Sequence, residues 1–251
     1  MLVILESAGR YSAFCGRALL AAVDAFRRPA ETMRQFYVHF LGALPLAAVA
    51  GLAIGVVLWM HLRGILVRFA GPETVQYLPT ALTLAVVLEF APIGAGLIVA
   101  GRSGASLAAE LGSMKLTEQV DAMNMLGLSP MRELVGPRVL ACTCALPLLT
   151  VFMDYLAILG SFAAEALTSG VTWLQFRAAC LDQLRFHDVV LATSKTAVFG
   201  FLIAAAGCYH GLAAGGGTEG VGRAATRGVV AATLSVVLAN VLLVRIIQVF
   251  G

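Results

Sequence analysis

The sequence predicts an all-α integral membrane protein with five membrane-spanning helices. Of its 251 residues, 60% are hydrophobic and only 12% are charged, about half the charged share of an average soluble domain. The mean hydropathy is +0.91. A soluble enzyme of this size needs more polar surface, and a disordered chain needs lower hydrophobicity, so the composition excludes both classes.

The five spans are identified by the length of their apolar segments. A bilayer core requires about 20 apolar residues per helix. Suitable segments cover residues 40–60, 78–101, 139–167, 189–209 and 228–250. The first has no charged residue, and the others carry only isolated ones. We therefore expect the chain, residues 1–251, to form a single membrane domain.

Basic residues predict the orientation of these spans. One set of connecting segments, beginning with the N-terminal one, carries 11 Lys and Arg residues, and the other set carries 4. Cytoplasmic segments of membrane proteins are enriched in basic residues. The N-terminus is therefore expected in the cytoplasm and the C-terminus on the opposite side.

The N-terminal segment, residues 1–28, has the pattern of an amphipathic helix. Its charged residues recur at spacings of 4, 7, 7 and 4, so they fall on one narrow stripe of an otherwise apolar cylinder: Glu6, Arg10, Arg17, Asp24 and Arg28. Pro29 ends the pattern. Such a helix lies in the membrane interface or packs on the spans of its own chain, and both arrangements can hold together.

No sequence motif for catalysis, metal binding or a cofactor is present. The chain lacks GxSxG, HExxH and the Walker GxxxxGK[ST] sequence, and its five cysteines form no CxxC pair. The net charge of +3 is too small and too scattered to predict nucleic-acid binding. We expect no catalytic residue, no metal and no cofactor, so any ATP must be bound by another subunit.

Three ionisable residues lie well inside the predicted spans: Glu89, Asp154 and Lys195. A charge in the bilayer core is costly, so these side chains should face the protein interior or a cavity. Their positions along the spans place them at similar depth. Together they are candidates for binding a zwitterionic lipid head group. A structural ion pair and a proton relay are the alternatives.

The loop between spans two and three predicts a surface helix over residues 114–127. Leu116, Val120, Met123 and Gly127 fall on one helical face. The acidic side chains of Glu118 and Asp121 point elsewhere. Such a helix could simply cover the surface, but Asp121-Ala122 followed by Gly127 is similar to the cytoplasmic loop of ABC importer permeases, which docks on an ATPase.

The segment from Glu89 to Leu140 resembles the MlaE/YrbE family of ABC permeases. The resembling sequence is AGRSGASLAAELGSMKLTEQVDAMNMLGLSPMRELVGPRVLA, and the likeness extends to Lys195-Thr-Ala-Val-Phe and to Arg223-Ala-Ala-Thr-Arg227. With the N-terminal helix and the five spans, it covers nearly the whole chain. One departure is Leu88, where many relatives have Arg.

The resemblance implies a permease that moves phospholipid or a related lipid between the bacterial inner membrane and a periplasmic carrier with MCE domains. The implied partners are a cytoplasmic ABC ATPase, a STAS-domain protein and a second permease copy, identical or paralogous. The residues that would couple to the ATPase are Glu118, Gln119, Asp121, Ala122, Gly127 and Arg223. The competing classes are a secondary transporter that uses Glu89 and Asp154 for proton coupling, and a structural membrane anchor.

Overall fold

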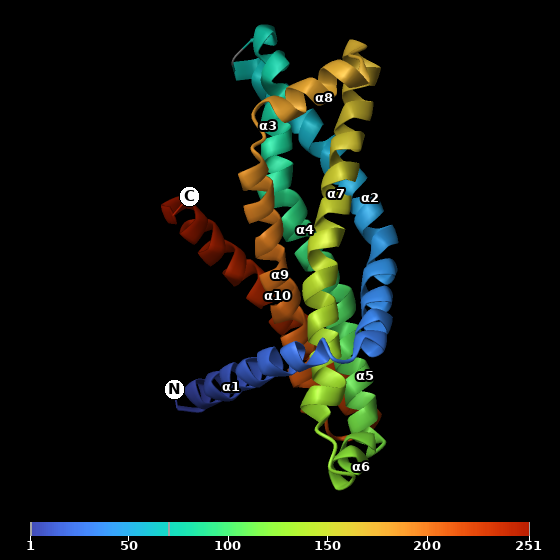
Figure 1. The fold of residues 1–251 in the computed structure, drawn as a ribbon. Coiled ribbons are helices and arrows are strands. Elements are labelled where there is room, and N and C mark those ends of the chain that lie inside the picture. The colour runs from blue at the N-terminus through green and yellow to red at the C-terminus, as the bar shows by residue number, and fades with distance from the viewer. Residues whose placement is uncertain (1, 70, 251) are drawn as a thin grey trace. The chain divides into compact units, whose positions relative to one another are not determined.

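The computed structural model describes residues 2–69 and 71–250, and no β-strand occurs among them. The fold is helical throughout (Figure 1). The helices are α1 (Leu2–Ala25), α2 (Pro29–Phe69), α3 (Leu78–Ala85), α4 (Ala91–Val99), α5 (Ala105–Leu116), α6 (Gln119–Met125), α7 (Gly136–Ser169), α8 (Trp173–Asp182), α9 (Phe186–Leu212) and α10 (Gly217–Phe250). A 3₁₀ segment precedes α3, namely η1 (Pro72–Tyr77), and three single π-helical turns interrupt the helices, namely η2 (Val86–Phe90), η3 (Ala100–Gly104) and η4 (Met131–Val135).

Five helical segments are long and apolar enough to cross a membrane, which confirms the predicted all-α membrane fold. They cover Pro29–Phe69, Glu73–Leu116, Met131–Ser169, Phe186–Leu212 and Gly217–Ile247. Each is longer than the apolar segment predicted from the sequence, because the helices continue past it into polar residues. The short helix α8, which the sequence analysis did not predict, lies between the third and fourth spans.

The chain divides into two compact units. The first contains residues 1–43, 96–146 and 197–251, and the second contains residues 44–95 and 147–196. In the first unit α10 packs along α5 and η3, and α1 packs on η4. Its core is formed by buried apolar side chains from several helices, among them Phe14, Leu107, Leu111, Val139 and Cys208.

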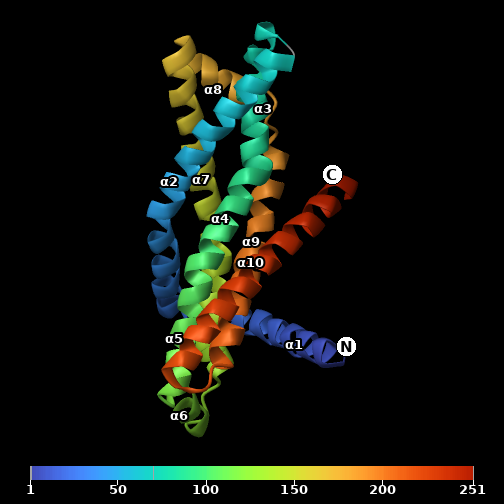
Figure 2. The same ribbon diagram turned by 180° about the vertical axis from the view of Figure 1, so that it is seen from behind.

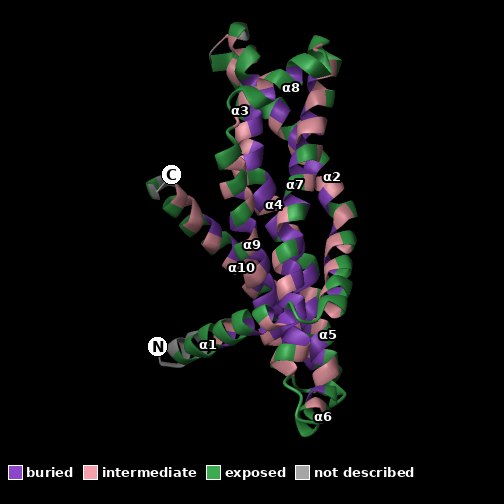
Figure 3. Cartoon of the chain, viewed as in Figure 1, coloured by how far each residue is buried: buried purple, intermediate pink, exposed green. Residues whose placement is uncertain are grey.

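Helix α1 packs on its own chain, which is one of the two arrangements that the sequence left open. One side is buried in the first unit, where Tyr11 and Phe14 meet the ring of Tyr209 edge-on at 5.2 and 5.4 Å between ring centres. The other side exposes Leu20 and Val23, and Figure 3 shows that exposed residues run along the helix. α1 therefore packs on its own chain and still presents an apolar surface.

In the second unit, the backbones of α2 and α7 lie close together at Gly55. A Cβ atom on Gly55 would collide with the backbone carbonyl of Ala157, so no larger residue fits between these two backbones. At one end of this unit α8 packs on α3. There the Thr80 hydroxyl donates a hydrogen bond to the Ala179 carbonyl at 2.8 Å.

The helix predicted over residues 114–127 is divided in the structure. Residues up to Leu116 belong to α5, Glu118 adopts a left-handed conformation with φ of 60°, and α6 then begins at Gln119. Because of this break, Leu116 does not share an apolar face with Val120 and is exposed, whereas Val120 is buried. Glu118 precedes α6, so it is not a surface neighbour of Asp121 on one continuous helix.

Candidate functional site

The site in the second unit is built around the π-helical turn η2. Pro92 follows this turn, and because proline has no N–H, the carbonyl of Leu88 cannot receive the usual hydrogen bond from the residue four positions later. Ala91 instead donates its N–H to the carbonyl of Val86, five residues earlier. Single π-turns of this kind are frequent at functional sites.

Lys195 of α9 supplies the donor that Leu88 lacks within its own helix. The ammonium Nζ donates to the Leu88 carbonyl at 2.5 Å and lies 3.2 Å from Oε1 of Glu89. The Lys195 side chain is only 3% exposed, whereas that of Glu89 is 39% exposed. The structure thus brings together the two oppositely charged residues of the predicted site, with the cation fixed inside and the carboxylate open on one side.

Asp154, the third residue of the predicted site, lies on α7 of the same unit. Its side chain is buried, and its Oδ1 atom has no hydrogen-bond partner in the described part of the chain. It forms no salt bridge with Lys195 within 4.0 Å among the described residues. The structure therefore joins Glu89 to Lys195 and leaves Asp154 apart from their ion pair.

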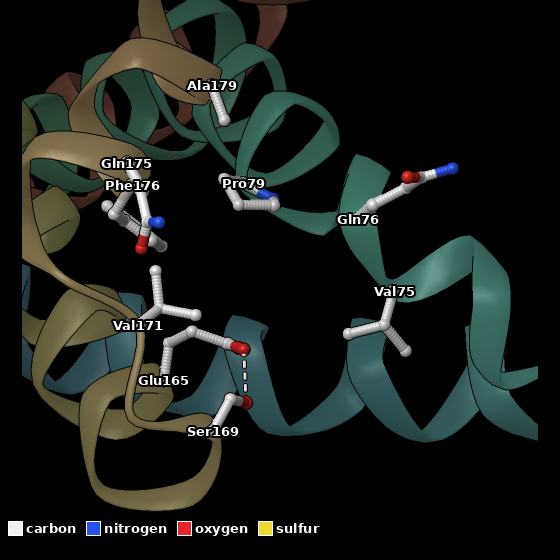
Figure 4. Close-up of a pocket in the computed structure, with 9 residues that line it drawn as sticks. All are labelled: Val75, Gln76, Pro79, Glu165, Ser169, Val171, Gln175, Phe176 and Ala179. Atoms are coloured by element: carbon white, nitrogen blue, oxygen red, sulfur yellow. Dashed lines mark hydrogen bonds between the residues drawn. The ribbon is translucent and has the colours of Figure 1, made fainter.

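A second polar cluster in this unit surrounds Glu165, which was not among the candidate residues chosen from the sequence. Trp59 donates its indole N–H to Glu165 Oε2, Ser169 donates to Oε1 at 2.5 Å, and Arg63 Nη1 lies 3.7 Å from Oε1. Glu165 and Ser169 border a cavity of about 430 Å³, with Pro79 on its other side (Figure 4). The two charged side chains of this cluster, Glu165 and Arg63, contact each other. We therefore interpret the cluster as a structural network.

The loop residues assigned to ATPase coupling lie in the first unit, on or beside α6. Asp121 accepts hydrogen bonds from Lys115 Nζ at 2.7 and 2.9 Å, and Gln119 donates to Thr117 Oγ1 at 2.9 Å. Glu118 and Ala122 are exposed. Asp121 is therefore occupied within the loop, which leaves Glu118 as its more accessible acidic group.

Gly127 ends α6 with a specific backbone motif. With φ of +75°, it directs its N–H to the Asn124 carbonyl at 3.0 Å, and the N–H of Leu128 reaches the Met123 carbonyl at 2.9 Å. This is a Schellman cap, in which glycine takes the left-handed position. The cap holds Met125 and Leu126 outward, and Figure 3 shows α6 as largely exposed.

Two residues of the quoted family sequence form an ion pair that the sequence analysis missed. Arg138 of α7 donates Nη2 to Oε1 of Glu110 on α5 at 2.6 Å and Nη1 to the Leu134 carbonyl at 2.8 Å. The sequence did contain a signal for this pair, because both charged residues lie in one motif next to apolar segments. The pair ties α5 to α7 in the first unit.

The five helices long and apolar enough to cross a membrane fit a multi-pass membrane protein. The Permease MlaE family profile matches residues 32–246, and the chain belongs to this family. It is accordingly a membrane permease subunit of an ABC transporter, which implies a partner ATPase.

Named relatives agree with this assignment. A probable ABC transporter permease protein of Rickettsia typhi is 32% identical over 242 residues, which cover 96% of this chain and 92% of the relative. A protein of Synechocystis with the same description is 36% identical over 159 residues, 63% of this chain and 60% of the relative. The chloroplast protein TRIGALACTOSYLDIACYLGLYCEROL 1 of Arabidopsis thaliana is 35% identical over 162 residues, 64% of this chain and 46% of the relative.

Proposed function

We propose that this permease moves phospholipid, or a related lipid, between the bacterial inner membrane and a periplasmic MCE-domain carrier, driven by a separate ATPase. The observation that carries the proposal is the Glu89–Lys195 pair, with a buried ammonium and a partly exposed carboxylate within spanning helices. A zwitterionic head group carries the same two charges, so its phosphate can meet Lys195 while its amine meets Glu89. The Arabidopsis relative is named after a glycolipid, which supports a lipid substrate.

ATP-driven work enters, in this proposal, through the loop around α6. Met125, Leu126 and Leu128 are exposed apolar side chains of the loop that also carries the exposed carboxylate of Glu118. An apolar tip with an acidic rim fits a groove on a partner protein, because apolar contacts provide most of the binding energy and charges provide the orientation. The chain itself is then a non-catalytic subunit.

The assembly we propose contains two copies of the permease, the ATPase, the MCE-domain protein and a STAS-domain protein. We place the contact with a second copy or a paralogue on the exposed face of α10, which includes Leu234, Leu238, Val241 and Leu242. The N-terminus is placed in the cytoplasm and the C-terminus in the periplasm, on the distribution of basic residues.

Lipid analysis of the purified complex tests the proposal. Mass spectrometry should find phospholipid bound to the wild-type complex, and Glu89→Ala or Lys195→Ala should reduce both bound lipid and transport while the complex still assembles. His187→Ala is a matched control, because this exposed residue lies on the same helix as Lys195. Unchanged bound lipid and unchanged transport in both variants would contradict the proposed site.

Transport measurements without the ATPase and with a collapsed proton gradient separate the competing functions. A secondary transporter that uses Glu89 and Asp154 would stay active without the ATPase and would lose activity when a proton gradient is collapsed. A structural pair would instead show loss of the complex from the membrane in Glu89→Ala, because the buried ammonium of Lys195 is then left without its charged partner. A passive anchor would tolerate every one of these substitutions.

A further inference from the structure

A basic cavity lies at the turn between α9 and α10, in the first unit. Its volume is about 350 Å³, and His210, Arg223 and Arg227 line it together with small alanine and glycine residues. This volume is within the range of small-ligand sites. Figure 2 shows the turn where the chain passes into α10.

The charges around this cavity do not balance. Arg223 and Arg227 are four residues apart on α10, so both project from one face of the helix. Arg223 Nη1 donates to Oε1 of Glu219 at 2.5 Å, and this carboxylate compensates one of the two arginines. No carboxylate of the described residues lies within 4.0 Å of Arg227. The cavity therefore has an excess of positive charge and attracts an anion.

The position of the cavity indicates which anion is available. α9 and α10 are both long and apolar enough to span a membrane, and Arg227 directly precedes residues 228–250, the apolar segment of α10, so this arginine is expected at the level of the membrane surface. Phospholipid phosphates lie at the same level, and basic pockets between spanning helices bind anionic head groups. Both arginines are exposed, which leaves their guanidinium groups accessible to such a ligand.

We propose that this cavity binds the phosphate of an anionic phospholipid head group, with Arg227 as the principal contact and Arg223 beside it. The inference goes beyond the proposed function, because it adds a lipid site that is distinct from Glu89 and Lys195. A lipid at this position holds the α9–α10 turn at the membrane surface.

Native mass spectrometry of the purified full-length chain in detergent tests this site. The probes are phosphatidylglycerol and phosphatidylcholine with identical acyl chains, so that only the head group differs. We expect phosphatidylglycerol to bind about 5-fold more tightly, the equivalent of about one arginine contact at a membrane surface. Arg227→Gln should remove this preference and Arg227→Lys should retain it. Arg177→Gln, a change of an exposed arginine on α8, should leave it unchanged.

Three results would overturn the proposal. The first is an unchanged preference for phosphatidylglycerol in Arg227→Gln. The second is complete displacement of the lipid by millimolar inorganic phosphate, which would assign the cavity to the free ion. The third is loss of ATPase co-purification in Arg227→Gln with unchanged lipid binding, which would assign the arginines to a protein contact. These results do not bear on Glu89 and Lys195, whose role is tested separately by the co-purified lipid.

Discussion

Arg138 and Glu110 form an ion pair in which the two partners differ sharply in exposure. The guanidinium side chain is 2% exposed, the carboxylate side chain is 43% exposed, and Nη2 to Oε1 measures 2.6 Å. The arginine depends on this contact because water cannot replace it. The carboxylate does not, because solvent reaches it. The pair should therefore respond unequally to loss of either partner.

We predict that Glu110→Ala destabilises the protein more than Arg138→Met. Glu110→Ala leaves a buried cation with only its contact to the Leu134 carbonyl, at a cost of about 1–3 kcal/mol. Arg138→Met removes the buried charge and keeps most of the side-chain volume, and Glu110 can then be hydrated. Thermal unfolding of the detergent-solubilised protein measures the difference. Equal or reversed losses would show that the pair does not stabilise the fold in this way.

The proline after η2 provides a second prediction. Pro92→Ala adds an N–H that can donate to the Leu88 carbonyl and so competes with Lys195 for this acceptor. The helix should be at least as stable, because proline is the least favourable residue in a helix interior. Lipid transport should nevertheless fall about 5-fold, which corresponds to one hydrogen bond of about 1 kcal/mol.

Pro147→Ala is the control for this experiment. Pro147 also lies inside a spanning helix, α7, and the carbonyl that Lys195 contacts, that of Leu88, belongs to a different helical segment. Its substitution should leave transport unchanged. Equal transport by wild type and Pro92→Ala would mean that the Leu88 carbonyl has no role in placing the lysine.

The left-handed residue before α6 allows stability and coupling to be separated. The backbone of Glu118 has φ of 60°, a conformation that is unfavourable for a residue with a side chain but not for glycine. Glu118→Gly should therefore raise the unfolding free energy by about 1 kcal/mol. If the Glu118 carboxylate contacts the ATPase, the same variant should bind the ATPase less tightly, and Glu118→Lys should bind it less tightly still.

Asp121 provides the comparison for these variants. Reversal of both charges, Glu118→Lys with Asp121→Lys, should abolish co-purification of the ATPase, but it also breaks the contact between Asp121 and Lys115 inside the loop. Lys115→Ala breaks that contact alone. Full ATPase association in the double variant would exclude α6 as the coupling element.

Cys180 of α8 gives a prediction about pH. Its thiol is buried and donates to the Pro79 carbonyl at 3.8 Å, and burial raises the pKa of the thiol. The thiolate is the reactive form of cysteine, so maleimide labelling of Cys180 should be slow at pH 8. The labelling rate should continue to rise as the pH is raised above about 8.5, the ordinary pKa of a cysteine. Ala178→Cys in a Cys180→Ala background should react faster at pH 8, since residue 178 is exposed.

The same labels test the orientation of the chain. An impermeant maleimide should reach Ala178→Cys in intact spheroplasts and should reach Met125→Cys only after lysis. Labelling of Met125→Cys in intact spheroplasts would reverse the proposed topology.

Much of this fold follows directly from the sequence, because long apolar segments predict spanning helices and a buried lysine predicts a counter-charge nearby. Glu89 and Lys195 were singled out as charges inside the spans, with an ion pair as one of the interpretations left open, and the structure shows them paired. Glu110 and Arg138 were missed because both lie at the ends of apolar segments, where charges are ordinarily solvated. The break at Glu118 could not be predicted, because the left-handed conformation of a glutamate depends on its packing environment. Asp154 shared the expected depth, but depth along a helix does not specify which way a side chain points.

The contact between Lys195 and the Leu88 carbonyl has a further consequence for a permease that alternates between substrate-bound and empty states. Because a backbone oxygen helps to retain the ammonium, the Glu89 carboxylate can change partners while the lysine keeps its place. In the empty state the two charges cancel each other. A zwitterion that enters exchanges one ion pair for two and leaves the total charge of the site at zero. Under the proposed function, loading and unloading of a zwitterion would move no net charge across the membrane at this site, so the membrane potential would neither drive the cycle nor oppose it.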